Sequence, residues 1–128
     1  MKVAYVDTSC LVALALDEPG ARGLAARLRR VDRLFSANLL EAEFRSAMQR
    51  EEVSAGVDQY LSAISWILPE RTLTPEIRVV LEHGYVRGAD LWHLSCALYL
   101  CGDPRMLPFL TLDDRQREVA AALGFPAV

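Results

Sequence analysis

Four acidic residues stand in positions where a carboxylate is more useful for chemistry than for solubility: Asp7, Glu43, Asp90 and Asp113. Carboxylates that share one crevice repel one another, which raises some of their pKa values and destabilises the fold unless a cation neutralises them. An all-oxygen set of donors selects a hard ion, so Mg²⁺ or Mn²⁺ is the expected cofactor. Such an ion can activate water for phosphodiester hydrolysis. The hypothesis requires that the four acids converge.

Asp7 and Asp113 each follow a short apolar segment that is expected to be a buried strand. In open parallel sheets ligands bind beyond the carboxyl ends of the strands, so both acids are expected at one edge. Either residue could instead cap the helix that follows it. At the second position Asp114 is better placed to cap a helix starting at Arg115, which would leave Asp113 free to point into the crevice. The two acids of this doublet could also exchange these roles.

Helical geometry separates two acids in the helix expected over residues 38–52. The apolar arc of this helix is formed by Leu39, Leu40, Phe44, Ala47 and Met48. Glu43 falls inside the arc, where an ionised carboxylate is costly unless it is paired or binds a metal. Glu41 lies outside the arc and precedes Arg45 by four residues, the favourable order for an exposed ion pair. Glu43 is therefore the candidate, with an arginine partner in the fold as the open alternative.

Asp90 is expected to open an apolar helix over residues 90–100, where an aspartate is ordinarily an N-cap. His93 follows one turn later, so the two side chains could share a metal ion. A histidine near the start of a buried helix more often forms a local hydrogen bond. We therefore expect a supporting role for His93 at most.

Short apolar segments alternate with amphipathic ones along the whole chain. Strands are expected at residues 2–6, 34–36 and 108–112, with residues 125–128 as an edge strand. Helices are expected from the segment after Asp7 to about Glu18 and over residues 21–30, 38–52, 56–68, 75–83, 90–100 and 115–123. This rhythm predicts an α/β fold with a central parallel sheet. A length of 128 residues predicts one domain over residues 1–128.

Composition narrows the classes of protein. The hydrophobic fraction is 52%, more than a small monomer easily hides from water, so a homodimer or another protein partner is expected. The longest apolar run, residues 10–16, is too short to span a bilayer, and no charged leader is seen, which predicts a cytoplasmic protein without a membrane segment. Cys10, Cys96 and Cys101 form no Cys-x-x-Cys pair, which argues against disulfides and structural zinc.

Charge gives a weaker indication. The net charge of −3 argues against a protein that coats nucleic acid through bulk positive charge. The basic residues are one lysine and thirteen arginines, and a guanidinium group can grip phosphate through two hydrogen bonds. Codon usage explains the arginine excess equally well.

Five short motifs occur in order along the chain. They are Val6-Asp7-Thr8-Ser9, Leu40-Glu41-Ala42-Glu43-Phe44-Arg45, Asp90-Leu91-Trp92-His93-Leu94, Thr111-Leu112-Asp113 and Gly124-Phe125-Pro126. Their order, spacing and total length together resemble the PIN-domain family, in particular the VapC toxins of toxin–antitoxin systems. The resemblance runs through the whole chain, although each motif is weak alone.

The resemblance implies a Mg²⁺- or Mn²⁺-dependent endoribonuclease with a three-layer α/β/α fold and a sheet of strand order 3-2-1-4-5. It implies roles for seven side chains: Asp7, Asp90 and Asp113 as metal ligands, Glu43 acting directly or through water, and Ser9, Thr111 and Asp114 in support. RNA would be the substrate, and a VapB-like antitoxin and a second copy of the chain would be the protein partners.

Two departures concern the packing of the site rather than the acids. The hydroxyl that the family often places six residues before the glutamate would fall at Ala37, whereas Ser36 lies one residue earlier. Leu91 and Trp92 are bulkier than the small residues often found after the third acid.

Two other classes of protein that place an aspartate after a strand fit the sequence less well than a metal-dependent ribonuclease. A phosphorylatable receiver domain needs a lysine after a late strand, and the only lysine is Lys2. A phosphatase of the haloacid dehalogenase type needs Asp-x-Asp, and Asp7-Thr8-Ser9 lacks the second acid. A PIN-like nuclease that processes RNA without an antitoxin, and a non-catalytic PIN-like module that binds protein or RNA, remain as alternatives. The complete set of four acids favours catalysis.

Overall fold

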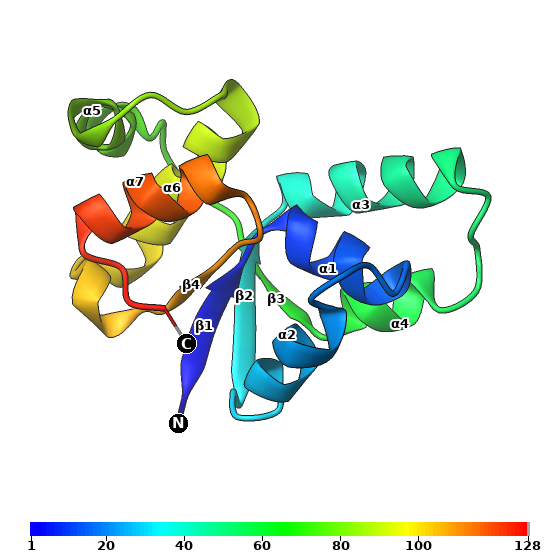
Figure 1. Cartoon of the computed structure of the whole chain (residues 1–128). Coiled ribbons are helices and arrows are strands. Elements are labelled where there is room, and N and C mark those ends of the chain that lie inside the picture. Colours follow the sequence, from blue (N-terminus) through cyan, green and yellow to red (C-terminus); the bar gives the residue numbers. More distant parts are fainter. Residues whose placement is uncertain (128) are drawn as a thin grey trace.

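The computed structural model describes residues 1–127 (Figure 1). Four parallel strands form one sheet in the order β3-β2-β1-β4. Their bounds are Val3–Val6 for β1, Arg33–Ala37 for β2, Ile64–Ile67 for β3 and Phe109–Leu110 for β4. The chain adds β2 and β3 on one side of β1 and then crosses over to place β4 on the other side. The winding therefore reverses between β1 and β4, which is where open α/β sheets bind ligands.

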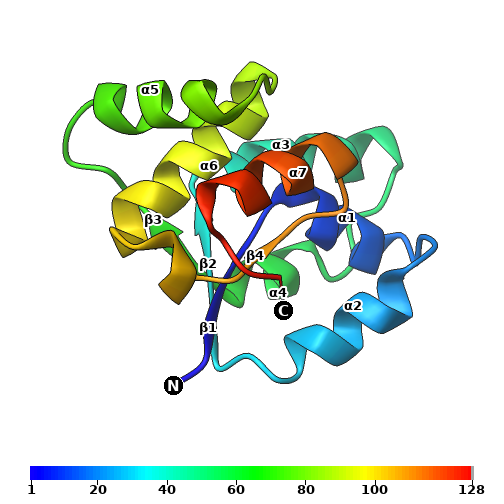
Figure 2. The ribbon, with the colours of Figure 1, turned by 60° about the vertical axis from the view of Figure 1, so that its left-hand side comes forward.

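Helices cover both faces of this sheet (Figures 1 and 2). Their bounds are Thr8–Ala15 for α1, Ala21–Leu28 for α2, Leu39–Arg50 for α3, Val57–Ser62 for α4, Thr74–His83 for α5, Gly88–Cys101 for α6 and Asp114–Leu123 for α7, with a 3-10 turn η1 at Pro104–Met106. In Figure 1, α5, α6 and α7 lie on one side of the strands and α1 to α4 on the other. Within residues 1–127 no helix is both long enough and apolar enough to cross a membrane.

The side chains of β1 explain the three layers. Ala4 and Val6 pack in a cluster with residues of α1 to α4, including Leu24 and Phe44. Tyr5 points to the opposite face and packs in a second cluster with residues of α5, α6 and α7. Successive side chains of a strand alternate between faces, so a strand that is apolar at every position must be covered on both sides. The predicted α/β class with a central parallel sheet is confirmed.

The sheet is one strand smaller than the resemblance implied. The order β3-β2-β1-β4 agrees with the first four strands of 3-2-1-4-5, but residues 125–127 form no strand. The tail reaches β4 through one backbone hydrogen bond, from Phe109 N to Pro126 O at 2.9 Å. Val128, the last residue of the expected edge strand, lies outside the described residues.

The helix expected over residues 56–68 is wrong in its second half. The helix α4 ends at Ser62, and β3 begins at Ile64. Isoleucine and tryptophan favour a pleated, half-buried surface, and β2 offers one: Leu34 pairs with Ile64, and Ala37 pairs with Ile67. Pairing with a strand thirty residues away therefore overrides the local helical pattern.

Candidate active site

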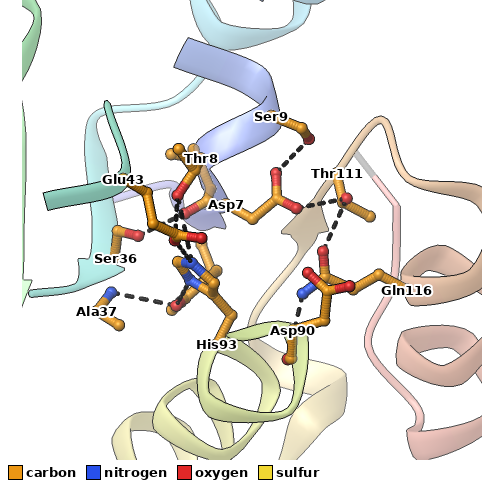
Figure 3. Close-up of polar contacts among 12 residues, drawn as sticks. Asp7, Thr8, Ser9, Ser36, Ala37, Glu43, Asp90, His93, Thr111 and Gln116 are labelled. Atoms are coloured by element: carbon orange, nitrogen blue, oxygen red, sulfur yellow. Dashed lines mark hydrogen bonds and ion pairs between the residues drawn. The ribbon is translucent and has the colours of Figure 1, made fainter. Parts of the chain in front are cut away.

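An aspartate lies at the point where the winding of the sheet reverses. Asp7 directly follows β1, and only 3% of its surface is exposed. Its Oδ1 accepts a hydrogen bond from Ser9 Oγ at 2.6 Å, and its Oδ2 accepts one from Thr111 Oγ1 at 2.6 Å (Figure 3). Because Ser9 belongs to α1 and Thr111 follows β4, the carboxylate is held from both sides of the reversal point.

Burial raises the pKa of Asp7, and the hydrogen bonds from Ser9 and Thr111 oppose that shift only in part. The contacts of Thr111 agree with this direction. Its hydroxyl has one proton and faces two oxygens, Asp7 Oδ2 at 2.6 Å and Gln116 Oε1 at 3.0 Å. A proton on Asp7 would let Thr111 donate to Gln116, and a cation beside Asp7 would lower the cost of its charge. The site therefore favours partial neutralisation of Asp7.

Gln116 connects the surroundings of Asp7 to α6. This residue of α7 is fully buried, and its Nε2 donates to the backbone oxygen of Asp90 at 3.3 Å. Thr111 Oγ1 also accepts a hydrogen bond from Asp113 N at 3.0 Å. The end of β4, the start of α7 and the start of α6 are thus joined around one threonine hydroxyl.

Asp90 lies in the first turn of α6, with Arg87 at the N-cap position, so the expected N-cap role of Asp90 is wrong. The helix begins two residues earlier than the apolar pattern indicated, because Gly88 and Ala89 extend it without contributing to that pattern. Burial raises the pKa of Asp90, and the charges of Asp113 and Asp7 raise it further. Three acids from three different elements therefore lie close enough to repel one another.

The expected division of roles between Asp113 and Asp114 is also wrong. Asp113 is the N-cap of α7, and its Oδ1 accepts a hydrogen bond from Gln116 N at 2.8 Å. Asp114 begins the helix one residue earlier than expected, and its side chain is 91% exposed and paired with Arg117 at 2.8 Å. Asp113 keeps its Oδ2 free of hydrogen bonds within residues 1–127, so it can cap the helix and still offer an oxygen to the crevice.

Glu43 forms the second half of the site, and it faces inward from α3 as its helical position predicted. Its Oε1 accepts hydrogen bonds from Thr8 Oγ1 at 2.7 Å and from His93 Nε2 at 2.9 Å (Figure 3). The hydrogen bond from His93 is the main reason that the pKa of Glu43 is lowered. On the outer face of the same helix, Glu41 and Arg45 form the predicted ion pair at 2.9 Å. The alternative of an arginine partner for Glu43 is wrong, since the nitrogen that contacts its carboxylate belongs to His93.

His93 does not form the local hydrogen bond that its position suggested. Its ring is 1% exposed on the inner face of α6, where β1 packs. Nδ1 lies 2.6 Å from the hydroxyl of Tyr5, and Nε2 faces Glu43. Both partners are distant in sequence, so nothing within one helical turn of His93 indicated them.

The carboxylate oxygens of the site are the kind of ligand that a hard divalent metal ion prefers. No three histidine, cysteine, aspartate or glutamate side chains in the part of the chain that the structure describes are arranged to hold one ion. Mg²⁺ usually keeps several waters and is held by only one or two carboxylates, so it does not need a closed protein cage. Asp7, Asp90 and the free oxygen of Asp113 are candidate donors, of which one or two would suffice for such a hydrated ion. Figure 3 shows Thr111 joined directly to Asp7 and through Gln116 to the backbone of Asp90.

Sequence reasoning missed three polar residues of the site. Tyr5 lies in an apolar strand and looked like core, and Gln116 lies among charged residues of α7 and looked exposed. Thr8 carried a usable signal, because a hydroxyl directly after Asp7 begins α1 on the side that faces α3. Buried glutamine gives no such signal in a single sequence.

A hollow of about 400 Å³ adjoins the acids. It is lined by Thr8, Ser9, Val12, Ala13, Glu18, Pro19, Ala47, Arg50 and Leu112. Thr8 and Ser9 also donate hydrogen bonds to Glu43 and Asp7. The hollow therefore shares a wall with both halves of the site.

Comparison with protein families matches residues 4–122 to the PIN domain, a span that contains β1 from its second residue, all of β2 to β4 and all four acids. The chain belongs to the PIN domain family. Comparison with curated proteins gives no match. PIN domains are generally nucleases.

Proposed function

We propose that this PIN domain is a Mg²⁺- or Mn²⁺-dependent endoribonuclease that acts in the cytoplasm as the toxin of a VapBC-type pair. The observation that carries the proposal is the placement of Asp7. A carboxylate that is almost wholly buried, held by two hydroxyls and close to the charges of Asp90 and Asp113, is costly unless a cation joins it.

The aspartates and the two hydroxyls of the site would have different roles. Asp7, Asp90 and Asp113 would hold the metal, one or two of them directly and the rest through its water ligands, while Ser9 and Thr111 fix the orientation of Asp7. When bound, the ion would supply a water of lowered pKa and positive charge near the scissile phosphate.

Glu43 completes this arrangement. Its carboxylate, ionised at neutral pH because His93 donates to it, would orient water or one of the metal's water ligands.

The adjoining hollow supports RNA as the substrate. Its volume of about 400 Å³ is enough for a nucleotide beside the acids, and its wall includes Arg50, whose side chain is 72% exposed. A guanidinium group at this place could contact a phosphate and so offset the repulsion between RNA and the acids.

Cleavage of RNA by the purified protein tests the function. Wild-type protein should cleave RNA in Mg²⁺ or Mn²⁺ and lose activity in EDTA, and Asp7→Asn should abolish cleavage. Asp58→Asn is the matched control, because Asp58 lies in α4, is 89% exposed and pairs with Arg45 on the outer face of α3. A fully active Asp7→Asn protein contradicts the site, and a wild type without metal-dependent cleavage favours a non-catalytic binding module.

We also propose that the protein forms a homodimer and binds an antitoxin through a basic segment that enters the acidic crevice. Apolar side chains left exposed, such as Leu68, Leu81 and Tyr85, support a protein partner. An antitoxin arginine would replace the metal's charge beside the acids.

Light scattering and co-expression with a neighbouring gene test the partners. A monomer at micromolar concentration that recovers no partner would contradict both proposals. Metal-dependent cleavage by such a protein would instead favour an RNA-processing nuclease without an antitoxin.

A further inference from the structure

His93 connects two polar groups that lie in different layers of the fold. Its Nδ1 lies 2.6 Å from Tyr5 Oη, and its Nε2 lies 2.9 Å from Glu43 Oε1. Tyr5 is fully buried and His93 is 1% exposed, so water does not compete for the contact between them. The direction of that hydrogen bond is therefore set by the protein groups alone.

The direction can be read from the Tyr5 end. The backbone N–H of Ala37 donates to Tyr5 Oη at 3.1 Å, which uses one lone pair of the phenol oxygen. Within residues 1–127, His93 Nδ1 is then the acceptor that the phenol proton meets. An Nδ1 that accepts carries no proton, so the ring proton resides on Nε2 and points to Glu43.

The opposite tautomer would leave Nε2 only a long contact with Thr8 Oγ1, at 3.3 Å, and the Thr8 hydroxyl already donates to Glu43 at 2.7 Å. A lone pair on Nε2 would face the oxygen of Glu43 at 2.9 Å, and two electron-rich atoms would repel. A proton on Nδ1 would be donated to Tyr5 Oη, and the phenol proton of Tyr5 would then lose Nδ1 as its acceptor. A buried donor without a partner is costly, so the fold selects the Nε2–H form.

We propose that His93 is a positioning residue, held by Tyr5 in its Nε2–H tautomer, which fixes the carboxylate of Glu43 so that Oε2 is left to serve the acid site. This inference rests on the proposed nuclease function. Thr8 and His93 both donate to Oε1, and Oε2 accepts no hydrogen bond within the described residues. Two donors from α1 and α6 on one oxygen hold a single orientation of a side chain that is otherwise 32% exposed.

Long-range ¹H–¹⁵N correlation spectra of the full-length protein report the tautomer directly. His93 should show an unprotonated Nδ1 and a protonated Nε2, and in Tyr5→Phe the His93 signals should shift toward a mixture of tautomers. His83, whose Nδ1 lies 2.8 Å from the backbone oxygen of Val79 on the exposed end of α5, should be unchanged in the variant. A wild-type His93 protonated on Nδ1 would overturn the inference.

Kinetics separate positioning from a merely structural role. In Tyr5→Phe, kcat should fall roughly 10- to 100-fold with KM little changed, as for other groups that orient a side chain at a metal site. Tyr60→Phe is the matched control, because Tyr60 packs against Phe44 of α3 and, among residues 1–127, its hydroxyl meets only Leu14 O at 3.5 Å. Wild-type kcat in folded Tyr5→Phe would overturn the inference.

Substitution of His93 gives a second test. His93→Gln keeps an N–H donor within reach of Glu43, whereas His93→Leu does not, so the glutamine variant should retain more kcat at similar thermal stability. Equal kcat in the two variants would overturn the positioning role. A wild type that cleaves no RNA overturns the function, whereas an active wild type with the other tautomer overturns only this inference.

Discussion

Asp7 and Glu43 are two acids of the candidate site whose pKa values shift in opposite directions. Both receive two hydrogen bonds, Asp7 from Ser9 and Thr111 and Glu43 from Thr8 and His93. Asp7 is nearly inaccessible to water, and burial raises its pKa. The side chain of Glu43 is 32% exposed, and the hydrogen bond from His93 lowers its pKa.

The difference indicates which acid depends on a cation. Two hydroxyls do not offset the loss of water at Asp7, so its charge is costly until an ion joins it. Glu43 keeps its charge without an ion, because a donor on a buried ring faces it. A bound metal would therefore stabilise the charge of Asp7 most, whereas the carboxylate of Glu43 is already ionised and oriented before metal binds.

The largest expected effect belongs to Asp7→Asn. The variant should lose metal-dependent cleavage and should be as stable as wild type or more stable in EDTA. An asparagine amide can donate to Thr111 Oγ1, which frees the threonine proton for Gln116 Oε1. Strong destabilisation of the folded variant would contradict this account of the Asp7 environment.

Asp7 should also make the stability of the wild type depend on pH. Its folded-state pKa is raised above about 3.9, the ordinary value for aspartate, so its contribution is greatest below that pH and is lost as pH rises through the raised pKa. The free energy of unfolding of Asp7→Asn relative to wild type should therefore increase from pH 4 toward neutrality. Urea unfolding in EDTA measures it, and a difference that shrinks with rising pH would reverse the assignment.

Glu43→Gln should cut turnover by roughly a hundredfold or more, because a charge that organises the nucleophile is removed. Glu41→Gln on the same helix should leave turnover and stability nearly unchanged, since it breaks only an exposed ion pair with Arg45. Cleavage assays over a Mg²⁺ titration compare the two. A damaging Glu41→Gln together with a silent Glu43→Gln would place the site on the wrong face of α3.

Thr111→Val should lower the free energy of unfolding by about 1–3 kcal/mol, because Asp7 Oδ2, Gln116 Oε1 and the backbone N–H of Asp113 lose the hydroxyl that they contact. Chemical denaturation measures the loss, and Thr72→Val at an exposed position is the control. Equal stability of the two variants would mean that the hydroxyl of Thr111 does not organise the Asp7 half.

The smallest expected effect separates the two adjacent acids of the last motif. Asp113→Ala should lose about 1 kcal/mol of stability, because it removes the N-cap of α7. Asp114→Ala should lose less, since that side chain faces solvent. Thermal unfolding of both variants measures these losses. A larger loss for Asp114→Ala than for Asp113→Ala would indicate that Asp114 is the cap.

The sequence was a good guide wherever one segment contained the whole reason for a structure. The face of α3 that carries Glu43 and the ion pair of Glu41 follow from helical spacing alone. The apolar run of β1 likewise predicted a strand covered on both faces.

The sequence was a poor guide wherever distant segments decide the structure. The strand β3 forms because β2 offers it a partner, and His93 turns away from its own helix because Tyr5 and Glu43 face it. The N-cap of α7 was assigned to the wrong aspartate because the helix starts one residue earlier than expected. That shift makes Asp113 the cap and Asp114 the first helical residue.

Anomalous diffraction from crystals of the wild-type protein soaked in Mn²⁺ tests the central claim most directly. We predict one or more ions bound by Asp7 together with Asp90 or Asp113, with water completing the coordination, and no ion at this place in Asp7→Asn crystals. Catalytically active protein whose soaked crystals carry no ion near Asp7, or carry one equally in the Asp7→Asn variant, would contradict the account.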